Sequence, residues 1–421
     1  MSIGQLSVLD NGLRVASREM PAANTISIGI WVNAGARDET EFEQGIAHML
    51  EHMAFKGTRS RDAQQIATEV EDVGGYMNAH TSREETAYYL RLLPEHLDMG
   101  IDILADILTE STLPPEEIER ERGVIIQEIG QSIDTPDDLV FDLFADAAHR
   151  GHTLGRPILG TVDSVSGFSR DDLDGFMSRF YGAGQMLVCA AGAVDHEGLV
   201  RRIDARLGSL KTATNTNRSL PQWNAGRHIV ERDLEQAHIV FGLPAIAASD
   251  QDRFAMMALS TLYGGGMSSR LFQQVREQRG LCYSIFSFAT MYSDNGHFAV
   301  YAGTSADQVD EMLRVCAGEL AAIAGNVGAD EVARAKAQLR ASLLMGRESV
   351  AGCADALARQ VNLFGRPSND DDLLAAIDAV DEAAVSAVAA RIIANGGPAL
   401  SAVGPAGPIM SNDALGTALS A

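Results

Sequence analysis

With 421 residues, of which 46% are hydrophobic and 21% charged, the chain is long enough for two domains and has the composition of a soluble globular protein. Its formal net charge of −24 argues against nucleic acids and anionic membranes as partners. The four cysteines form no Cys-x-x-Cys pair, which is typical of free thiols in a reducing compartment. The N-terminus lacks the features of a signal peptide and no apolar run reaches the length of a membrane span, so we expect a cytoplasmic protein.

The first half of the chain combines strands and helices. A hairpin is predicted around Asp10-Asn11-Gly12, because an Asn-Gly turn suits the twist of two paired strands. Gly74-Gly75 is a plausible end for a helix, and Pro114-Pro115 opens another. Strands are predicted at 26–32, 76–81, 85–92 and 185–191, and helices within 45–58 and at 62–73, 95–108, 116–132, 139–149, 170–180 and 197–207.

The second half of the chain repeats the first. Residues 257–275 align without a gap on residues 48–66, an offset of 209 (257 − 48), and Phe364-Gly-Arg-Pro367 aligns on Leu154-Gly-Arg-Pro157. The polar, unpatterned stretch between the halves reads as a linker. The sequence therefore predicts an α+β protein with two homologous domains, each a mixed sheet with helices. The predicted limits are 1–215 and 229–421, with a linker at 216–228.

The clearest chemical motif is His48-x-x-Glu51-His52, which lies in an apolar segment predicted to be helical. Residues four apart share one face of a helix, so both imidazoles can point at one metal ion. Glu51 then lies close enough to act on a water molecule at that ion. This is the zincin motif with its glutamate on the other side. The alternative is two helix histidines satisfied by neighbours, with Glu51 in solvent.

The internal repeat helps to decide between a metal site and two structural histidines. In the second copy, the three motif positions are occupied by Met257, Ser260 and Thr261, which cannot supply the same metal chemistry. Since the second copy keeps the fold and lacks the motif, the fold does not require it. We therefore favour a functional role for the motif and predict that the second domain binds no metal.

A catalytic zinc ion needs a third protein ligand. Glu128 is the strongest candidate, because it lies in the apolar run Gly123–Ile129, where an unpaired carboxylate would be costly. Glu121 lies two turns earlier on the same face and could orient a ligand. The pattern also allows Glu128 to face solvent.

Five segments together resemble the pitrilysin/insulinase family of zinc peptidases, and most closely its mitochondrial-processing-peptidase-like subfamily of short chains. They are residues 47–58, 78–89, 121–128, 154–160 and 264–283. The resemblance implies one Zn²⁺ per chain, held by His48, His52 and Glu128. It implies that Glu51 is the general base and that Glu121 is an outer-shell partner of the site.

The resemblance also implies residues that hold the peptide. Asn78 and Ala79 match the Asn-Ala signature of the substrate-binding edge strand, and Phe55 matches a residue that lines the pocket after the scissile bond. Arg276 and Tyr283 match a pair that contacts the substrate and stabilises the oxyanion.

Two further residues match acidic positions that recognise an arginine near the cleavage site. They are Asp138 and Asp142, ten and fourteen residues after Glu128. Asp138 stands where the processing enzymes carry a longer glutamate. Asp137 and Asp138 could equally be acids in the first turn of a helix.

Family members enclose a chamber between two halves that close like a clam shell, and this chain supplies one half. The resemblance therefore implies a dimer that cleaves short or unfolded peptides, with a preference for basic ones. We expect a homodimer in which Arg276 and Tyr283 act in the partner's site. One alternative is a heterodimer in which this chain is the zinc half, and another is a non-catalytic structural or peptide-binding homologue.

Overall fold

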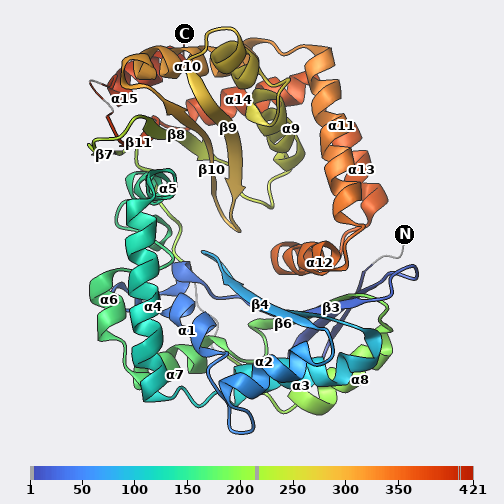
Figure 1. Cartoon of the computed structure of the whole chain (residues 1–421). Coiled ribbons are helices and arrows are strands. Elements are labelled where there is room, and N and C mark those ends of the chain that lie inside the picture. The colour runs from blue at the N-terminus through green and yellow to red at the C-terminus, as the bar shows by residue number, and fades with distance from the viewer. Residues whose placement is uncertain (1–3, 214–217, 406, 408, 421) are drawn as a thin grey trace. The chain divides into compact units, whose positions relative to one another are not determined.

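A computed structural model describes residues 4–213, 218–405, 407 and 409–420, which form two compact units (Figure 1). The first unit comprises Met1–Gly130, Arg156–Arg218 and Leu344–Asp370, and the second comprises Gln131–Gly155, Ser219–Leu343 and Asp371–Ala421. The first unit thus includes residues 344–370 from the second half of the sequence, and the second unit includes residues 131–155 from the first half. The predicted domain limits at 215 and 229 do not contain these two exchanged segments. Residues 216 and 217 of the predicted linker lie outside the described residues.

The first unit is built on a mixed sheet of six strands in the order β1-β2-β6-β3-β5-β4. The pair β2 and β6 is parallel, and the other neighbours are antiparallel. The strands are β1 (Gln5–Val8), β2 (Arg14–Glu19), β3 (Ile26–Val32), β4 (Tyr76–Thr81), β5 (Thr86–Leu92) and β6 (Met186–Gly192). The helices are α1 (Ile46–Met53), α2 (Ala63–Glu71), α3 (Leu97–Thr109), α4 (Pro115–Asp134, most of which belongs here), α6 (Val162–Gly167), α7 (Arg170–Phe180), α8 (His196–Leu207) and α12 (Val350–Phe364).

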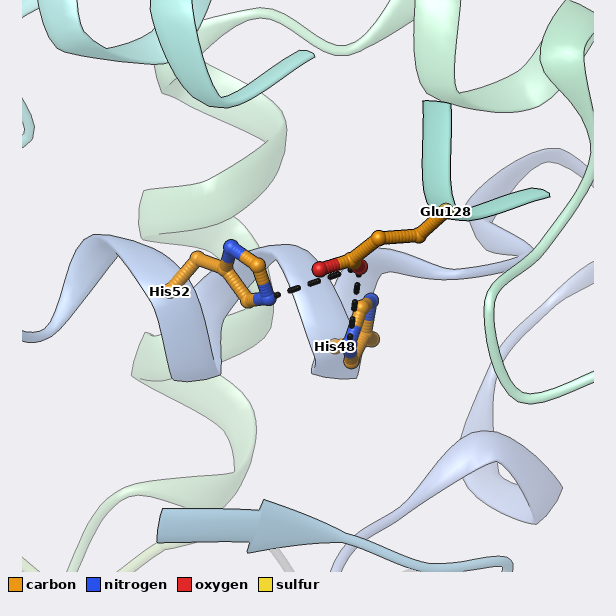
Figure 2. A group of neighbouring side chains, drawn as sticks. All are labelled: His48, His52 and Glu128. Atoms are coloured by element: carbon orange, nitrogen blue, oxygen red, sulfur yellow. Dashed lines mark ion pairs between the residues drawn. The ribbon is translucent and has the colours of Figure 1, made fainter. Parts of the chain in front are cut away.

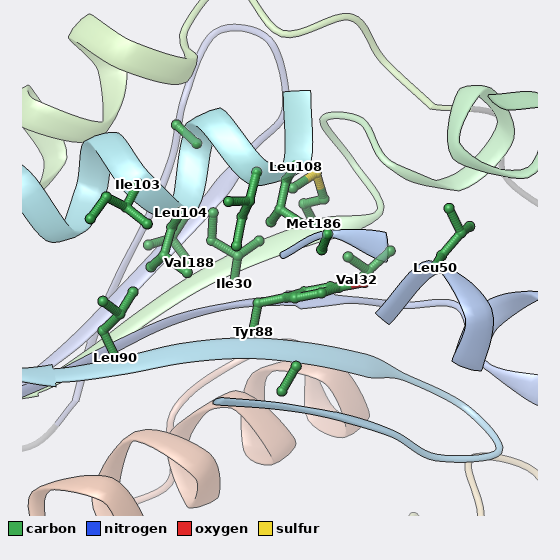
Figure 3. Close-up of a cluster of buried hydrophobic side chains, with 14 of the residues drawn as sticks. Ile30, Val32, Leu50, Tyr88, Leu90, Ile103, Leu104, Leu108, Met186 and Val188 are labelled. Atoms are coloured by element: carbon green, nitrogen blue, oxygen red, sulfur yellow. The ribbon is translucent and has the colours of Figure 1, made fainter. Parts of the chain in front are cut away.

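Helices cover both faces of this sheet. On one face, Ile30, Tyr88 and Val188 from three strands pack with Leu104 and Leu108 of α3 (Figure 3). Because side chains alternate along a strand, the intervening residues of β3 and β6 face the other way, and these two strands are buried along their whole length.

Helix α12 covers the second face. Its Leu357 and Val361 pack with Trp31 of β3 and Leu187 of β6. The helix comes from the second half of the sequence, 158 residues beyond the end of β6 (350 − 192). The first sheet therefore depends on both halves of the chain for its burial.

The second unit repeats this plan on a sheet of five strands in the order β7-β11-β8-β10-β9. The pair β7 and β11 is parallel, and the others are antiparallel. The strands are β7 (Arg227–Val230), β8 (Ala237–Ala245), β9 (Cys282–Met291), β10 (Gly296–Thr304) and β11 (Ala399–Val403). The helices are α5 (Pro136–Ala148), α9 (Arg253–Gly264), α10 (Val309–Gly325), α11 (Ala329–Gly346, most of which belongs here), α13 (Asp370–Asp378), α14 (Glu382–Ala394) and α15 (Asn412–Leu419).

The exchange of helices is reciprocal. In the second unit, α9, α10 and α14 pack on one face of the sheet, and α5 from the first half of the sequence packs on the other. Ser401 of β11 donates a hydrogen bond to the carbonyl oxygen of Val140 in α5 (2.7 Å). Both units thus share one architecture, and the predicted α+β class with two similar domains is confirmed.

None of the helices in the described parts of the chain combines the length and the apolarity that crossing a membrane requires.

A buried ionic cluster joins the two ends of the segment that carries α12 to strand β2. Asp370 accepts hydrogen bonds from Arg18 of β2, and its Oδ1 lies 3.1 Å from Nε of Arg347. All three side chains are at most 7% exposed. The cluster therefore ties both ends of the exchanged segment to the first sheet.

We predict that Asp370→Ala lowers the free energy of unfolding by about 3–5 kcal/mol, because it leaves two buried guanidinium groups without their carboxylate. Urea denaturation followed by circular dichroism measures this loss. Asp372→Ala, in the same helix but exposed, is the control and should stay within about 0.5 kcal/mol of the wild type. Equal stabilities for the two variants would contradict the prediction.

Candidate metal centre

Helix α1 carries both histidines of the motif on one face. Its opposite face is buried in the first core through the side chains of Ile46, Met49, Leu50 and Met53. His48 and His52, one turn apart, project away from that core, and their ring centroids lie 4.6 Å apart. The apolar spacing of the helix thus fixes which way the imidazoles point.

The N-terminus of α1 is held by Glu39, which is buried. Its Oε2 accepts a hydrogen bond from the backbone N–H of Gly45 (2.9 Å), and its Oε1 accepts one from Ala47 (3.0 Å). These are N–H groups that a helix start leaves unpaired. Burial raises the pKa of Glu39 to about 8, against the lowering effect of the two N–H donors.

The Gly-Arg-Pro motif of the first half packs against the same helix start. Arg156 donates a hydrogen bond to the carbonyl oxygen of Glu39 (3.2 Å). Gly45 (φ 90°) lies so close to Gly160 that a Cβ on either would clash with the other's backbone. The glycine at each position is therefore required by close approach.

Glu128 reaches the two histidines from α4 (Figure 2). Its Oε2 lies 3.8 Å from Nε2 of His48 and 3.7 Å from Nε2 of His52. One ligand atom from each residue lies within 4.8 Å of the others, and no other such group of three metal-binding side chains occurs among the described residues. The structure thus brings together the three residues that the sequence nominated as ligands.

The donor set fits a zinc ion. Four ligands at about 2.0–2.1 Å around a tetrahedral ion stand about 3.3 Å apart, so small movements would bring these three atoms into range. Burial lowers the pKa of His48 to about 4, with a contribution from nearby His52. His48 is therefore neutral near pH 7, the form that binds metal.

Glu121 lies beside His52, one of the two histidines that the sequence expected it to orient. Its Oε2 lies 2.9 Å from Nδ1 of His52, and its Oε1 accepts a hydrogen bond from the ammonium group of Lys56 (2.7 Å). Burial by itself would raise the pKa of Glu121, but the hydrogen bonds from Lys56 and His52 outweigh it and lower that pKa. An ionised Glu121 accepts a hydrogen bond from Nδ1–H of His52, and this tautomer leaves Nε2 of His52 available to a metal ion.

Glu51 faces strand β4. The hydroxyl of Thr81, the last residue of that strand, donates a hydrogen bond to Oε2 of Glu51 (2.6 Å). Burial raises the pKa of Glu51, while the Thr81 hydrogen bond and the neighbouring His52 and His80 lower it. A carboxylate with a raised pKa, adjacent to the ligands, suits a general base.

The predicted peptide-binding residues lie close by in the same unit. Asn78 and Ala79 are on β4, the edge strand of the sheet, and Asn78 is exposed whereas Ala79 is buried. The backbone N–H of Ala79 donates to Oδ1 of Asn78 (2.9 Å). Phe55 follows α1 and packs against the core, 6.3 Å from Tyr88 between ring centroids.

Arg276 and Tyr283 belong to the second unit, where the structure brings them into contact with each other. The Arg276 guanidinium carbon lies 5.1 Å from the centroid of the Tyr283 ring and 4.7 Å from that of Phe272. Arg276 lies in a π-helical turn (Phe272–Glu277), a feature frequent at functional sites. Tyr283 is 73% exposed on the edge strand β9.

Asp138 and Asp142 also belong to the second unit, on α5. Asp138 is exposed in the first turn of the helix, as the alternative structural explanation expected. Asp142 lies one turn further on and is half-buried. The two aspartates therefore lie in a different compact unit from His48, His52 and Glu128.

Sequence reasoning missed Glu39, Lys56 and Thr81. Lys56 lies four residues after His52, a spacing that could have suggested a shared face. Thr81 lies two residues after Ala79 and therefore on the same face of β4. Knowing that this face packs against α1 would have suggested Thr81 as a neighbour of Glu51. No local pattern marks Glu39, because its partners lie six and eight residues away across a loop.

A mixed-sheet domain with an inverted zinc motif, joined to a copy that lacks the motif, defines a class of metallopeptidase. Residues 14–162 match the sequence model described as Insulinase (Peptidase family M16), and residues 167–339 match that of the Peptidase M16 inactive domain. The chain belongs to peptidase family M16, which confirms the resemblance drawn from its motifs.

Individual relatives agree with this assignment. The chain is 39% identical to an uncharacterized zinc protease of Streptomyces coelicolor, over 95% of this chain and 89% of the relative. It shares its fold with a protease from Helicobacter pylori (TM-score 0.87, 23% identity, 95% and 99% of the two chains). A structure from Pseudomonas fluorescens described as a peptidase M16 inactive domain is equally similar (TM-score 0.89, 19% identity, 97% and 100%).

We predict that Lys56→Met weakens zinc binding by about tenfold or more, because Glu121 loses the cation that holds it in place beside His52. Competition with a chromophoric chelator measures the dissociation constant. Lys211→Met, at an exposed position outside the site, is the matched control and should bind zinc like the wild type. Unchanged affinity in the folded Lys56→Met variant would show that Glu121 holds its position without the lysine.

Proposed function

We propose that this protein is a zinc-dependent endopeptidase that hydrolyses short or unfolded peptides. The observation that carries the proposal is the convergence of His48, His52 and Glu128 within 4.8 Å, next to Glu51 on the same helix. The family assignment and the zinc-protease names of its relatives support it.

The chemistry follows from the nature of these groups. A zinc ion held by His48, His52 and Glu128 would supply a Lewis acid for the scissile carbonyl and would lower the pKa of a water molecule to about 7. Glu51 accepts the proton of the attacking water and returns it to the leaving amine. His48, His52 and Glu128 supply the ligands, and Glu121 with Lys56 keeps His52 in the tautomer that leaves Nε2 available.

Strand β4 is the proposed docking edge for the substrate. It is the last strand of its sheet, and the described residues supply no strand on its outer side. An extended peptide can add there by backbone hydrogen bonds, with little regard to its sequence. Asn78 and Ala79 contribute that edge, and Phe55 contributes an apolar surface for a bulky side chain next to the scissile bond.

We further propose that the working enzyme is a homodimer that encloses a chamber. Arg276 and Tyr283 of one subunit would then complete the site of the other, with Arg276 on a substrate carbonyl and Tyr283 as an oxyanion donor. Their mutual contact and the exposure of Tyr283 support a pair that is available to a substrate.

The proposed preference is for a basic residue near the cleavage site. Asp138 and Asp142 stand one turn apart on α5 and could receive an arginine side chain. The overall charge of −24 also favours the approach of cationic peptides.

Two alternatives are kept. A non-catalytic role is disfavoured because the ligand set and Glu51 are complete, although the same fold occurs in a structure described as an inactive domain. A heterodimer in which this chain supplies the zinc half is distinguished by whether the purified chain cleaves peptides by itself.

We predict that Glu51→Gln lowers turnover of a quenched fluorescent peptide by at least about a hundredfold, because the general base is lost, while zinc content is kept. The peptide carries one arginine followed by a bulky apolar residue. Chelation of the wild type should abolish cleavage, and added zinc should restore it. Glu71→Gln, an exposed substitution on α2, is the control. Retained cleavage after Glu51→Gln or after zinc removal would overturn the proposal.

We predict that mixing Glu51→Gln subunits with Tyr283→Phe subunits restores up to about a quarter of the wild-type activity, since half of the dimers formed at random are mixed and each has one intact site. Exchange is verified with two affinity tags, and cleavage is measured before and after mixing. No rescue in verified mixed dimers would show that Tyr283 acts within its own subunit.

A further inference from the structure

Strand β4 is connected to Glu51 through one side chain. The register of β4 on β5 places Met77, Ala79 and Thr81 on the face that packs toward the core and α1, and Ala79 is itself part of that core. Thr81 is therefore held by the sheet on one side and by its 2.6 Å hydrogen bond to Oε2 of Glu51 on the other. The end of the edge strand thus touches the glutamate of the motif.

The hydrogen bond restricts how the Glu51 carboxylate can turn. Thr81 is the only hydrogen-bond partner that this carboxylate has among the described residues. With Oε2 held as an acceptor, Oε1 is the oxygen that remains to take a proton. The hydroxyl can donate to Oε2 both before and after a proton reaches Oε1, so the contact does not have to break during turnover.

We propose that Thr81 is a positioning residue that orients Glu51 for proton transfer, an inference that rests on the proposed peptidase function. The side chain does not touch the substrate or the metal ligands in this role. It acts through Glu51, by restricting its carboxylate to one rotation.

The placement of Thr81 gives this role a consequence for catalysis. The same six-residue strand provides the proposed docking edge at Asn78 and Ala79 and ends at the residue that holds the base. A peptide bound along β4 is then fixed relative to Glu51 by one rigid element. A side chain that only stabilised the strand would affect peptide binding, whereas one that orients Glu51 affects the chemical step.

The test compares Thr81→Val, which keeps the shape and removes the hydroxyl, with Thr81→Ser, which keeps the hydroxyl. We expect Thr81→Val to lower kcat by about tenfold to a hundredfold, the effect of losing a hydrogen bond to a charged group, with KM near that of the wild type. Thr81→Ser should recover most of the loss. Thr81→Ala serves in place of the valine variant if that variant does not fold.

Three further measurements separate positioning from damage. Zinc stoichiometry and affinity should be unchanged in Thr81→Val. Thr109→Val, which removes another half-buried hydroxyl in α3, should keep the wild-type kcat. In a Glu51→Gln background, Thr81→Val should have no further effect, because the two residues act as one unit.

The outcomes are distinct. A wild-type kcat in the folded Thr81→Val variant, a rise in KM alone, or additive losses with Glu51→Gln would overturn the role of Thr81 and leave the peptidase proposal standing. Absence of zinc-dependent cleavage in the wild type would overturn the proposed function, and this inference with it.

Discussion

The candidate site depends on the fixed position of one short helix. Helix α1 has eight residues, too few to be stable by itself in water. Burial of its apolar face in the first core and the two hydrogen bonds from its N-terminus to Glu39 hold it in place. Glu39 is positioned in turn by the Gly-Arg-Pro segment through Arg156. These contacts come from the loop before α1 and from residues more than a hundred positions later. The motif itself is local in sequence, but the position of its two imidazoles depends on tertiary contacts.

The two units share one fold, but only the first carries the His48-x-x-Glu51-His52 motif. Each buries both faces of its sheet by receiving a helix from the other half of the sequence, α12 in the first and α5 in the second. In the second unit, α9 carries Met257, Ser260 and Thr261 at the motif positions. The Ser260 hydroxyl donates to the carbonyl oxygen of Ser287 on β9, and the Thr261 hydroxyl donates to that of Met257 one turn earlier. The candidate metal ligands of the first unit are therefore not needed for the shared fold, which supports a chemical reason for their presence.

In the proposed mechanism, the first unit supplies the zinc ligands, the base and the docking strand, and the second supplies the Arg276–Tyr283 pair. Three polar contacts surround the proposed ligands and Glu51, and each affects the protonation or orientation of one side chain. Lys56 keeps Glu121 ionised, Glu121 fixes the tautomer of His52, and Thr81 restricts the carboxylate of Glu51. Burying the carboxylates of Glu121 and Glu51 without partners would be costly, so the contacts with Lys56 and Thr81 also favour their burial.

The sequence by itself determined the class of fold, the repeat and three candidate metal ligands, because each has a local or periodic signature. The four-residue spacing of His48 and His52, the isolated charge of Glu128 in an apolar run and the offset of 209 residues between the halves can all be read from the printed chain. Only the tertiary structure decided that α5 and α12 are exchanged between the units, since the apolar face of a helix does not identify the sheet that it packs on. Likewise, only the fold placed Glu39, Lys56 and Thr81 at the site, because their hydrogen bonds join segments whose meeting depends on how the helices and the sheet pack.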